Sequence, residues 1–226
     1  MKRFAIIAFT LLFVGIGITS ASATSSLWDW AFYIDGTTFE CYLGDSMPAT
    51  GVPVTFDIVT GLGTLTWETN VAGMHSFIAF FDHDIEEDTN TFFNEYGVAI
   101  GDPAAGQSWE IDDPFFGNIY YNNVLTGSLD NSNEASGDVS LAMGWNFNVP
   151  PGQTATIELI LANNDPLSGF YLSQTDSDSL ETIYFSSTLT IEGGGPAPVP
   201  EPGTWLLLCC GLIGLFGFGR KRLIKG

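Results

Sequence analysis

The sequence predicts an all-β domain at residues 24–192, an antiparallel β-sandwich or jelly roll, flanked by two terminal segments that do not belong to it. Apolar residues alternate with small or polar ones repeatedly along the middle of the chain. Sustained 3.6-residue periodicity is missing there, and Gly, Pro and Asn clusters separate the alternating runs. Because alternation places apolar side chains on one face, each run is expected to form a half-buried strand.

The clearest alternating run covers residues 139–149. Its apolar members are Val139, Leu141, Met143, Trp145, Phe147 and Val149. The pattern recurs at residues 155–161, and again at residues 183–191, where Ser187 interrupts it. Turn residues bound each of these runs, which predicts separate strands.

Two shorter runs, residues 55–59 and 64–68, flank the Gly-Leu-Gly sequence at residues 61–63. Glycine tolerates the backbone conformations of tight turns, so this arrangement predicts a hairpin. Counting all runs, we expect about eight to ten short strands, which favours a sandwich or jelly roll over a small closed barrel.

The charge of the chain is distributed unevenly. Its six Lys and Arg residues all lie at the two ends, whereas 25 of the 26 acidic residues lie between residues 24 and 195. Such an acidic surface repels phosphate backbones, which excludes nucleic acid as a partner. Divalent cations or cationic polymers fit it better, although the carboxylates can equally serve only to keep the domain soluble.

The N-terminal end has the three regions of a secretory signal peptide at residues 1–23. Lys2 and Arg3 are followed by an apolar run at residues 4–18 and by small residues that include Ala21 and Ala23. We expect cleavage after Ala23. An uncleaved anchor is disfavoured because fifteen helical residues span only about 22 Å of a hydrocarbon core of about 30 Å.

The C-terminal end contains a Gly/Pro linker at residues 193–199, a Pro-Glu-Pro tripeptide, an apolar stretch at residues 204–219 and a basic cluster. The tripeptide and the cluster comprise Pro200, Glu201, Pro202, Arg220, Lys221 and Arg222. The apolar stretch predicts a short transmembrane helix. Since basic residues stay on the cytoplasmic side, both ends of the precursor should face the cytoplasm and the acidic domain should face outward.

The order of these C-terminal features, at residues 200–226, resembles the sorting segment of PEP-CTERM proteins. The resemblance implies that an exosortase, a membrane-embedded cysteine transpeptidase, recognises the chain as its substrate. It also implies removal of the tail near Pro200, Glu201 and Pro202 during delivery to the cell surface or extracellular matrix. The resemblance is confined to the tail and implies nothing about what the domain binds.

A candidate calcium site follows the apolar residues 77–81. Four carboxylates alternate there: Asp82, Asp84, Glu86 and Asp88. In an extended or looped backbone they could direct oxygen ligands to one side, which suits Ca²⁺. The alternative is a solvated acidic loop that ends the strand. His75 and His83 offer too few ligands for zinc, and Cys41 is expected to be a small buried apolar residue.

Two further clusters suggest other activities. Glu110 and Asp112 beside Trp109 are compatible with a glycan hydrolase, in which two acids flank an aromatic platform. Trp109, Tyr120 and Tyr121, near several Asn side chains, could instead stack on a polysaccharide. The sequence contains no nucleophile motif of the hydrolase type.

We therefore expect a non-enzymatic protein of the cell surface or extracellular matrix, with a structural or interaction role in an envelope or biofilm. The export machinery, an exosortase and the membrane are its expected partners. A calcium-dependent polysaccharide-binding module is the alternative, and a glycan hydrolase is the third hypothesis.

Overall fold

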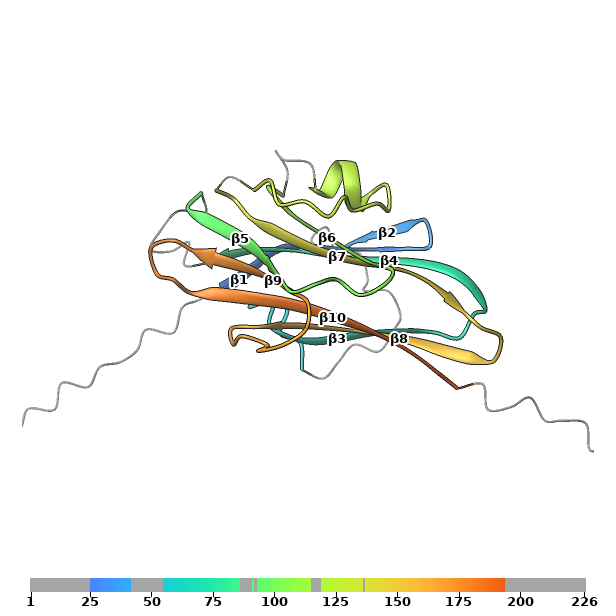
Figure 1. The fold of residues 1–226 in the computed structure, drawn as a ribbon. Coiled ribbons are helices and arrows are strands. Elements are labelled where there is room, and N and C mark those ends of the chain that lie inside the picture. The colour runs from blue at the N-terminus through green and yellow to red at the C-terminus, as the bar shows by residue number, and fades with distance from the viewer. Residues whose placement is uncertain are drawn as a thin grey trace, which may run out of the picture.

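The structure, a computed structural model, describes residues 25–41, 55–85, 91, 93–114, 119–135 and 137–193. Ten strands form two five-stranded antiparallel sheets, and these lie as two layers in Figure 1. The predicted all-β sandwich is thereby confirmed. The predicted signal peptide, most of the Gly/Pro linker and the sorting segment lie outside the described residues.

The first sheet has the strand order β2-β1-β4-β7-β6. Its strands are β1 (Ser25–Ile34), β2 (Thr37–Glu40), β4 (Gly73–Ile85), β6 (Gln107–Asp112) and β7 (Ser140–Val149). The second sheet has the order β3-β8-β10-β9-β5. Its strands are β3 (Gly63–Thr69), β5 (Glu95–Ile100), β8 (Gln153–Ala162), β9 (Tyr171–Asp176) and β10 (Thr182–Gly193).

The three long alternating runs of the sequence form strands β7, β8 and β10, as predicted. The predicted hairpin at residues 55–68 is wrong. Residues 55–61 form turns joined to Leu62 by one isolated bridge from Asp57, and β3 pairs with β8 instead. Gly63 has φ +129°, and a side chain there would overlap the Thr55 carbonyl, so the chain folds back too closely for a regular two-stranded ladder.

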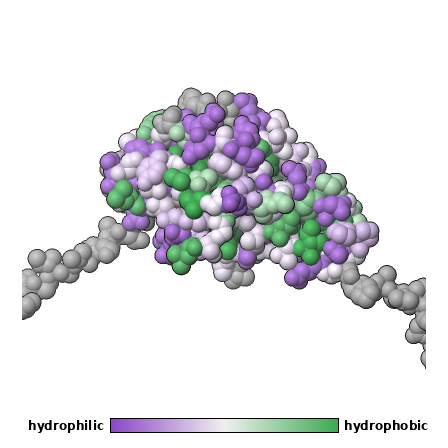
Figure 2. All heavy atoms as spheres, viewed as in Figure 1, coloured by the Kyte–Doolittle hydropathy of each residue, from purple (hydrophilic) through white to green (hydrophobic). Residues whose placement is uncertain are grey.

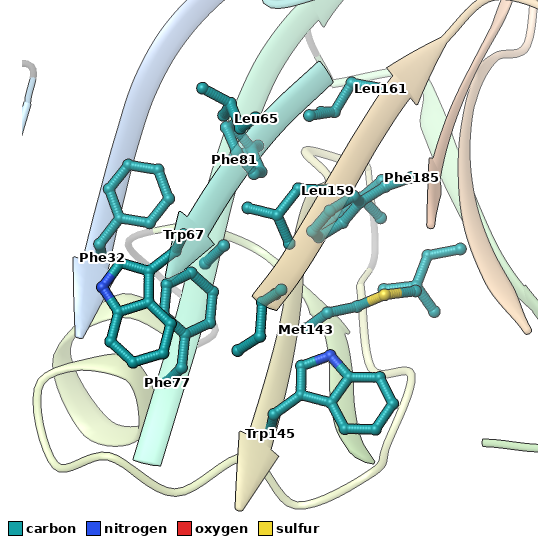
Figure 3. Close-up of a cluster of buried hydrophobic side chains, with 14 of the residues drawn as sticks. Phe32, Leu65, Trp67, Phe77, Phe81, Met143, Trp145, Leu159, Leu161 and Phe185 are labelled. Atoms are coloured by element: carbon teal, nitrogen blue, oxygen red, sulfur yellow. The ribbon is translucent and has the colours of Figure 1, made fainter. Parts of the chain in front are cut away.

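The main core fills the space between the sheets, and its side chains come from alternate positions of the facing strands (Figure 3). Aromatic rings dominate it. The Phe81 and Phe185 rings meet edge to face across the two sheets, with centroids 5.2 Å apart, and the Trp67 and Phe77 rings lie 5.3 Å apart. Rings at these separations add favourable contacts to the large apolar area that they bury.

A second, smaller apolar cluster covers the opposite face of the first sheet. There the π-helix η1 (Ile119–Val124) packs on β4, β6 and β7, and Figure 1 shows it on the outer side of that sheet. The cluster comprises Ala31, Ile78, Phe80, Ile119, Tyr120, Val124, Leu129 and Ala142. The middle of the first sheet is therefore buried on both faces.

One polar network is enclosed between the sheets. The Ser187 hydroxyl accepts hydrogen bonds from the Trp145 indole (3.0 Å) and from the Gln107 side-chain amide (3.1 Å). The side-chain oxygen of Gln107, Oε1, accepts a hydrogen bond from the Ala104 backbone N–H at 3.0 Å. The Gln107 amide also donates to the Ser187 backbone carbonyl at 3.4 Å. The hydroxyl of Ser187, which interrupts the apolar pattern of β10, therefore serves two buried donors and is the acceptor of the Trp145 indole.

Ser187→Ala should lower the free energy of unfolding by about 1–3 kcal/mol, because it leaves the Trp145 indole N–H buried without its acceptor and removes one of the acceptors of the Gln107 amide. Urea denaturation measures the loss. Ser186→Ala is the matched control, because Ser186 is the half-buried neighbour that points away from the core. Equal losses in the two variants would contradict this account of Ser187.

Candidate functional site

The acidic segment at residues 82–88 begins inside a strand and is buried there, which corrects the alternative of a solvated loop for Asp82 and Asp84. β4 continues to Ile85, and β1 pairs with it up to the register Ser25↔Ile85. Asp82 and Asp84 are only 2% and 7% exposed. The strand continues because Phe81, His83 and Ile85 alternate with these carboxylates and are themselves buried. Glu86 and Asp88 lie outside the described residues.

Strand register places Asp82 in a row of four buried polar residues across the first sheet. Asp29 of β1 lies opposite Asp82, Asp82 lies opposite Ser140 of β7, and Ser140 lies opposite Asp112 of β6. All four side chains are on the outer face, next to the apolar cluster under η1, because Ala31, Phe80 and Ala142 occupy the neighbouring row on that face. We call Asp29, Asp82, Ser140 and Asp112 the carboxylate row.

Burial dominates the electrostatics of this row. Desolvation raises the pKa of Asp29 to about 6. It also raises the pKa of Asp138, which lies near the row, to about 6. It raises the pKa of Asp82 well above the ordinary value, and the nearby charges of Asp138, Asp84, Asp29 and Glu95 raise it further. Burial also raises the pKa of Asp112. The ionised forms are therefore disfavoured throughout the row.

Glu95, the first residue of β5, lies near Asp82 of this row. Its carboxylate accepts hydrogen bonds from the Ile85 backbone N–H (3.3 Å) and from the Gln174 side-chain amide (2.6 Å). The Gln174 amide also donates to the His83 backbone carbonyl. Burial raises the pKa of Glu95 to about 8. Glu95 thus connects the second sheet to the end of β4.

The two histidines have different environments and do not form a joint site. Nδ1 of His75 lies 2.7 Å from the Asp35 carboxylate, and its Nε2 lies 2.8 Å from the Val71 carbonyl. Two acceptors favour the doubly protonated ring, and its pKa is raised despite the opposing effect of burial. His83 is buried near the Gly61 carbonyl, and desolvation lowers its pKa to about 4. His83 is therefore neutral at neutral pH.

The side chains proposed for glycan chemistry are separated by the strand alternation of β6. Glu110 lies on the outer face, where both of its oxygens accept from the Asn123 amide of η1 at 2.7 Å. Trp109 is on the opposite face and packs on the main core, with its ring 6.0 Å from that of Phe170. Tyr120 is buried, whereas Tyr121 is 55% exposed. Cys41 packs against the core but is only half-buried, where the sequence predicted a buried residue.

The sequence contains one signal for the carboxylate row, which is Asp29. Asp29 is a single acid inside the run Leu27 to Ile34, which is otherwise apolar or aromatic. A lone carboxylate at such a position must be buried or must face a neighbouring strand. Its partners could not be read from the sequence, because they depend on strand register.

Within the described ranges, no three His, Cys, Asp or Glu side chains are grouped closely enough to hold a metal ion as they stand. The helical part of these ranges includes no segment of the length and apolarity needed to cross a membrane.

Comparison with known proteins identifies the tail. The family described as the PEP-CTERM protein-sorting motif matches residues 198–222. The chain carries a PEP-CTERM sorting motif in its C-terminal tail. The motif marks it for export and for exosortase-dependent sorting at the membrane toward the cell surface. No curated protein and no solved structure matches the chain, and no family covers the β-sandwich of this PEP-CTERM protein.

The raised carboxyl pKa values predict that the sandwich loses stability as the pH rises from about 5 to about 8, and that the loss levels off above that. A carboxyl group with a higher pKa in the folded state favours folding when protonated, and this contribution disappears as the pH passes the folded pKa. In this window the relevant groups are Glu110, whose pKa burial raises to about 7, and Glu95 at about 8. Melting temperatures recorded by circular dichroism across the window should therefore fall.

Glu95→Gln, which has no proton to lose, should flatten the upper part of this pH profile. Glu192→Gln, at an exposed position near the end of β10, should leave the profile unchanged. A melting temperature that rises with pH in the original protein would contradict the interpretation.

Proposed function

We propose that this PEP-CTERM protein has a non-enzymatic, structural or interaction role in the cell envelope or a biofilm matrix, to which exosortase processing delivers it. The observation that carries the proposal is the sorting motif at residues 198–222. It is joined to a β-sandwich in which residues 25–193 contain neither Lys nor Arg. Such a body repels other copies and anionic surfaces, which suits a protein that must stay soluble after release.

The environments of the titratable side chains support a role without catalysis. Both oxygens of Glu110 are held by Asn123, His75 is held between Asp35 and Val71, and His83 is enclosed in the core. Each of these groups already has a structural role in the sandwich. A general acid or base must instead reach a substrate proton at hydrogen-bond distance.

The sorting proposal predicts two processing events that mass spectrometry can detect. In a host that has an exosortase, the mature protein should begin at Thr24 and end near residues 200–202. In the same host without the exosortase, the tail should remain attached. Replacing Pro200, Glu201 and Pro202 by Ala should have the effect of deleting the enzyme, because it removes the recognised tripeptide.

Replacement of Pro196 and Pro198 by Ala is the matched control, since it alters the linker and keeps the tripeptide. An intact tail in every host, or normal cleavage of the triple variant, would overturn the proposal.

A polysaccharide partner is a second proposal, supported by the outer face of the second sheet. Tyr96 and Val98 of β5 are 45% and 41% exposed there, because the intervening Gly97 packs toward Ile111 and Val139 of the core. Tyr184 of β10 lies on the same face, opposite Ser173 of β9, which in turn lies opposite Val98. Figure 2 shows hydrophobic residues in small groups between hydrophilic ones, on one side of the molecule. The exposed ring of Tyr96, on the same face as the half-buried ring of Tyr184, suits stacking on neutral sugars.

Tyr96→Ala should weaken retention by neutral matrix polysaccharides in affinity electrophoresis about 3- to 10-fold, the loss that corresponds to one aromatic contact. Tyr121→Ala is the control, because Tyr121 is exposed on η1, which covers the other sheet. If Tyr121→Ala weakens retention and Tyr96→Ala does not, the polysaccharide binds to the aromatic residues predicted at positions 109–121 and not to the second sheet. No retention of the original protein would refute polysaccharide binding.

A further inference from the structure

Asp29 and Asp82 present two carboxylates to each other across neighbouring strands. They are directly opposite in the antiparallel pair of β1 and β4, and each is more than 90% buried. Side chains at opposite positions have Cβ atoms about 4.5–5.5 Å apart, and like charges there destabilise the sheet. The pair therefore needs a positive charge or a proton between the two strands.

No basic side chain of the domain can supply that charge. There is no Lys or Arg between Arg3 and Arg220. His75 lies seven residues from Asp82 along β4, which is about 24 Å at the usual strand rise. His83 alternates with Asp82 along β4 and therefore points to the opposite face of the sheet, where it is fully buried. Neither histidine can neutralise the Asp29–Asp82 pair at neutral pH.

One oxygen of Asp82 is unsatisfied. Asp82 is 2% exposed, and its Oδ1 atom is buried without a hydrogen-bond partner. An unpaired buried carboxylate oxygen costs considerable free energy, so native proteins seldom retain one without a function or a bound ion. This atom belongs to the residue at the centre of the acidic group, whose nearby charges are Asp138, Asp84, Asp29 and Glu95.

We propose that Asp29 and Asp82 bind a divalent cation between β1 and β4, on the outer face of the first sheet. A hard dication would bridge the facing carboxylates and give Asp82 Oδ1 its missing partner. Ca²⁺ fits better than Mg²⁺, because it accepts irregular sets of six to eight oxygens, including water, whereas Mg²⁺ needs a near-ideal octahedron.

The proposed site differs from the one predicted from the sequence. That prediction took four consecutive alternating carboxylates from one loop, whereas here two ligands come from different strands. Since no three acidic or histidine side chains converge within the described part of the chain, two carboxylates form the protein's share of the site and water completes the coordination. Asp84 and Asp138 contribute negative potential that favours the cation.

Calcium titration of the full chain, purified in detergent and stripped with EDTA, tests the site. At a calcium concentration about 100-fold above the dissociation constant, the melting temperature should rise by about 5–10 °C. Tb³⁺ provides a second readout. Trp28 and Trp30 adjoin Asp29 in sequence, so excitation of tryptophan should sensitise the luminescence of a bound lanthanide.

Asp82→Asn should abolish both the calcium shift and the Tb³⁺ signal, and Asp29→Asn should weaken both at least 10-fold. Without calcium, Asp82→Asn should melt no lower than the original protein at neutral pH, because the neutral amide avoids the cost of a buried carboxylate charge. Glu158→Gln, an exposed carboxylate on β8 of the other sheet, should retain the full shift.

Two results would overturn the proposal. The first is an original protein whose melting temperature does not respond to millimolar calcium, which would mean that protons neutralise the pair. The second is an equal calcium shift in Asp82→Asn and Glu158→Gln, which would mean that calcium only screens the acidic surface. Because every readout is made on purified protein, either result leaves the processing of the tail untouched.

Discussion

The structure depends on one electrostatic constraint: a domain without Lys or Arg buries several carboxylates on one face of one sheet. In most proteins a buried acid is paired with a base, and the pair tolerates the loss of water. Here protons, hydrogen-bond donors or cations from solution must fulfil that role. The raised pKa values of Asp29, Asp82, Glu95 and Asp138 are the direct consequence.

The two faces of the first sheet handle polar groups in different ways. Between the sheets, Ser187 receives the Trp145 indole and the Gln107 amide, so the enclosed network consists of neutral groups that satisfy one another. On the outer face, η1 supplies a donor to Glu110 through Asn123. The neighbouring carboxylate row has only Ser140 as a neutral member. That asymmetry makes the row, together with Glu95 and Glu110, a place where the composition of the solution can act on stability.

The tail and the body carry separate information. The sorting motif specifies where the protein goes, and it occupies a short segment after a Gly/Pro linker. The sandwich specifies what the delivered protein does, and its stability comes from aromatic packing between the sheets. On the proposed function, acidity connects the two, because a body of high negative charge repels other copies of itself and attracts cations.

The sequence by itself determined the properties that are local or additive. The alternating runs at residues 139–149, 155–161 and 183–191 established strands and an all-β sandwich, and the order of tripeptide, apolar stretch and basic cluster established the sorting tail. The alternation of apolar and polar residues is a property of a single strand. A sorting motif is recognised by its enzyme as a linear sequence. Neither requires knowledge of distant residues.

Only the tertiary structure decided which strands are neighbours and what each neighbour faces. The run at residues 64–68 pairs with β8 and not with residues 55–59, and Asp82 lies opposite Asp29, which is more than fifty residues earlier in the chain. Register between strands is a long-range choice, made by packing both sheets around one core. For that reason the sequence could identify Asp82 and Asp84 as candidate ligands, but it could not show that they belong to a strand or that Asp29 completes the pair.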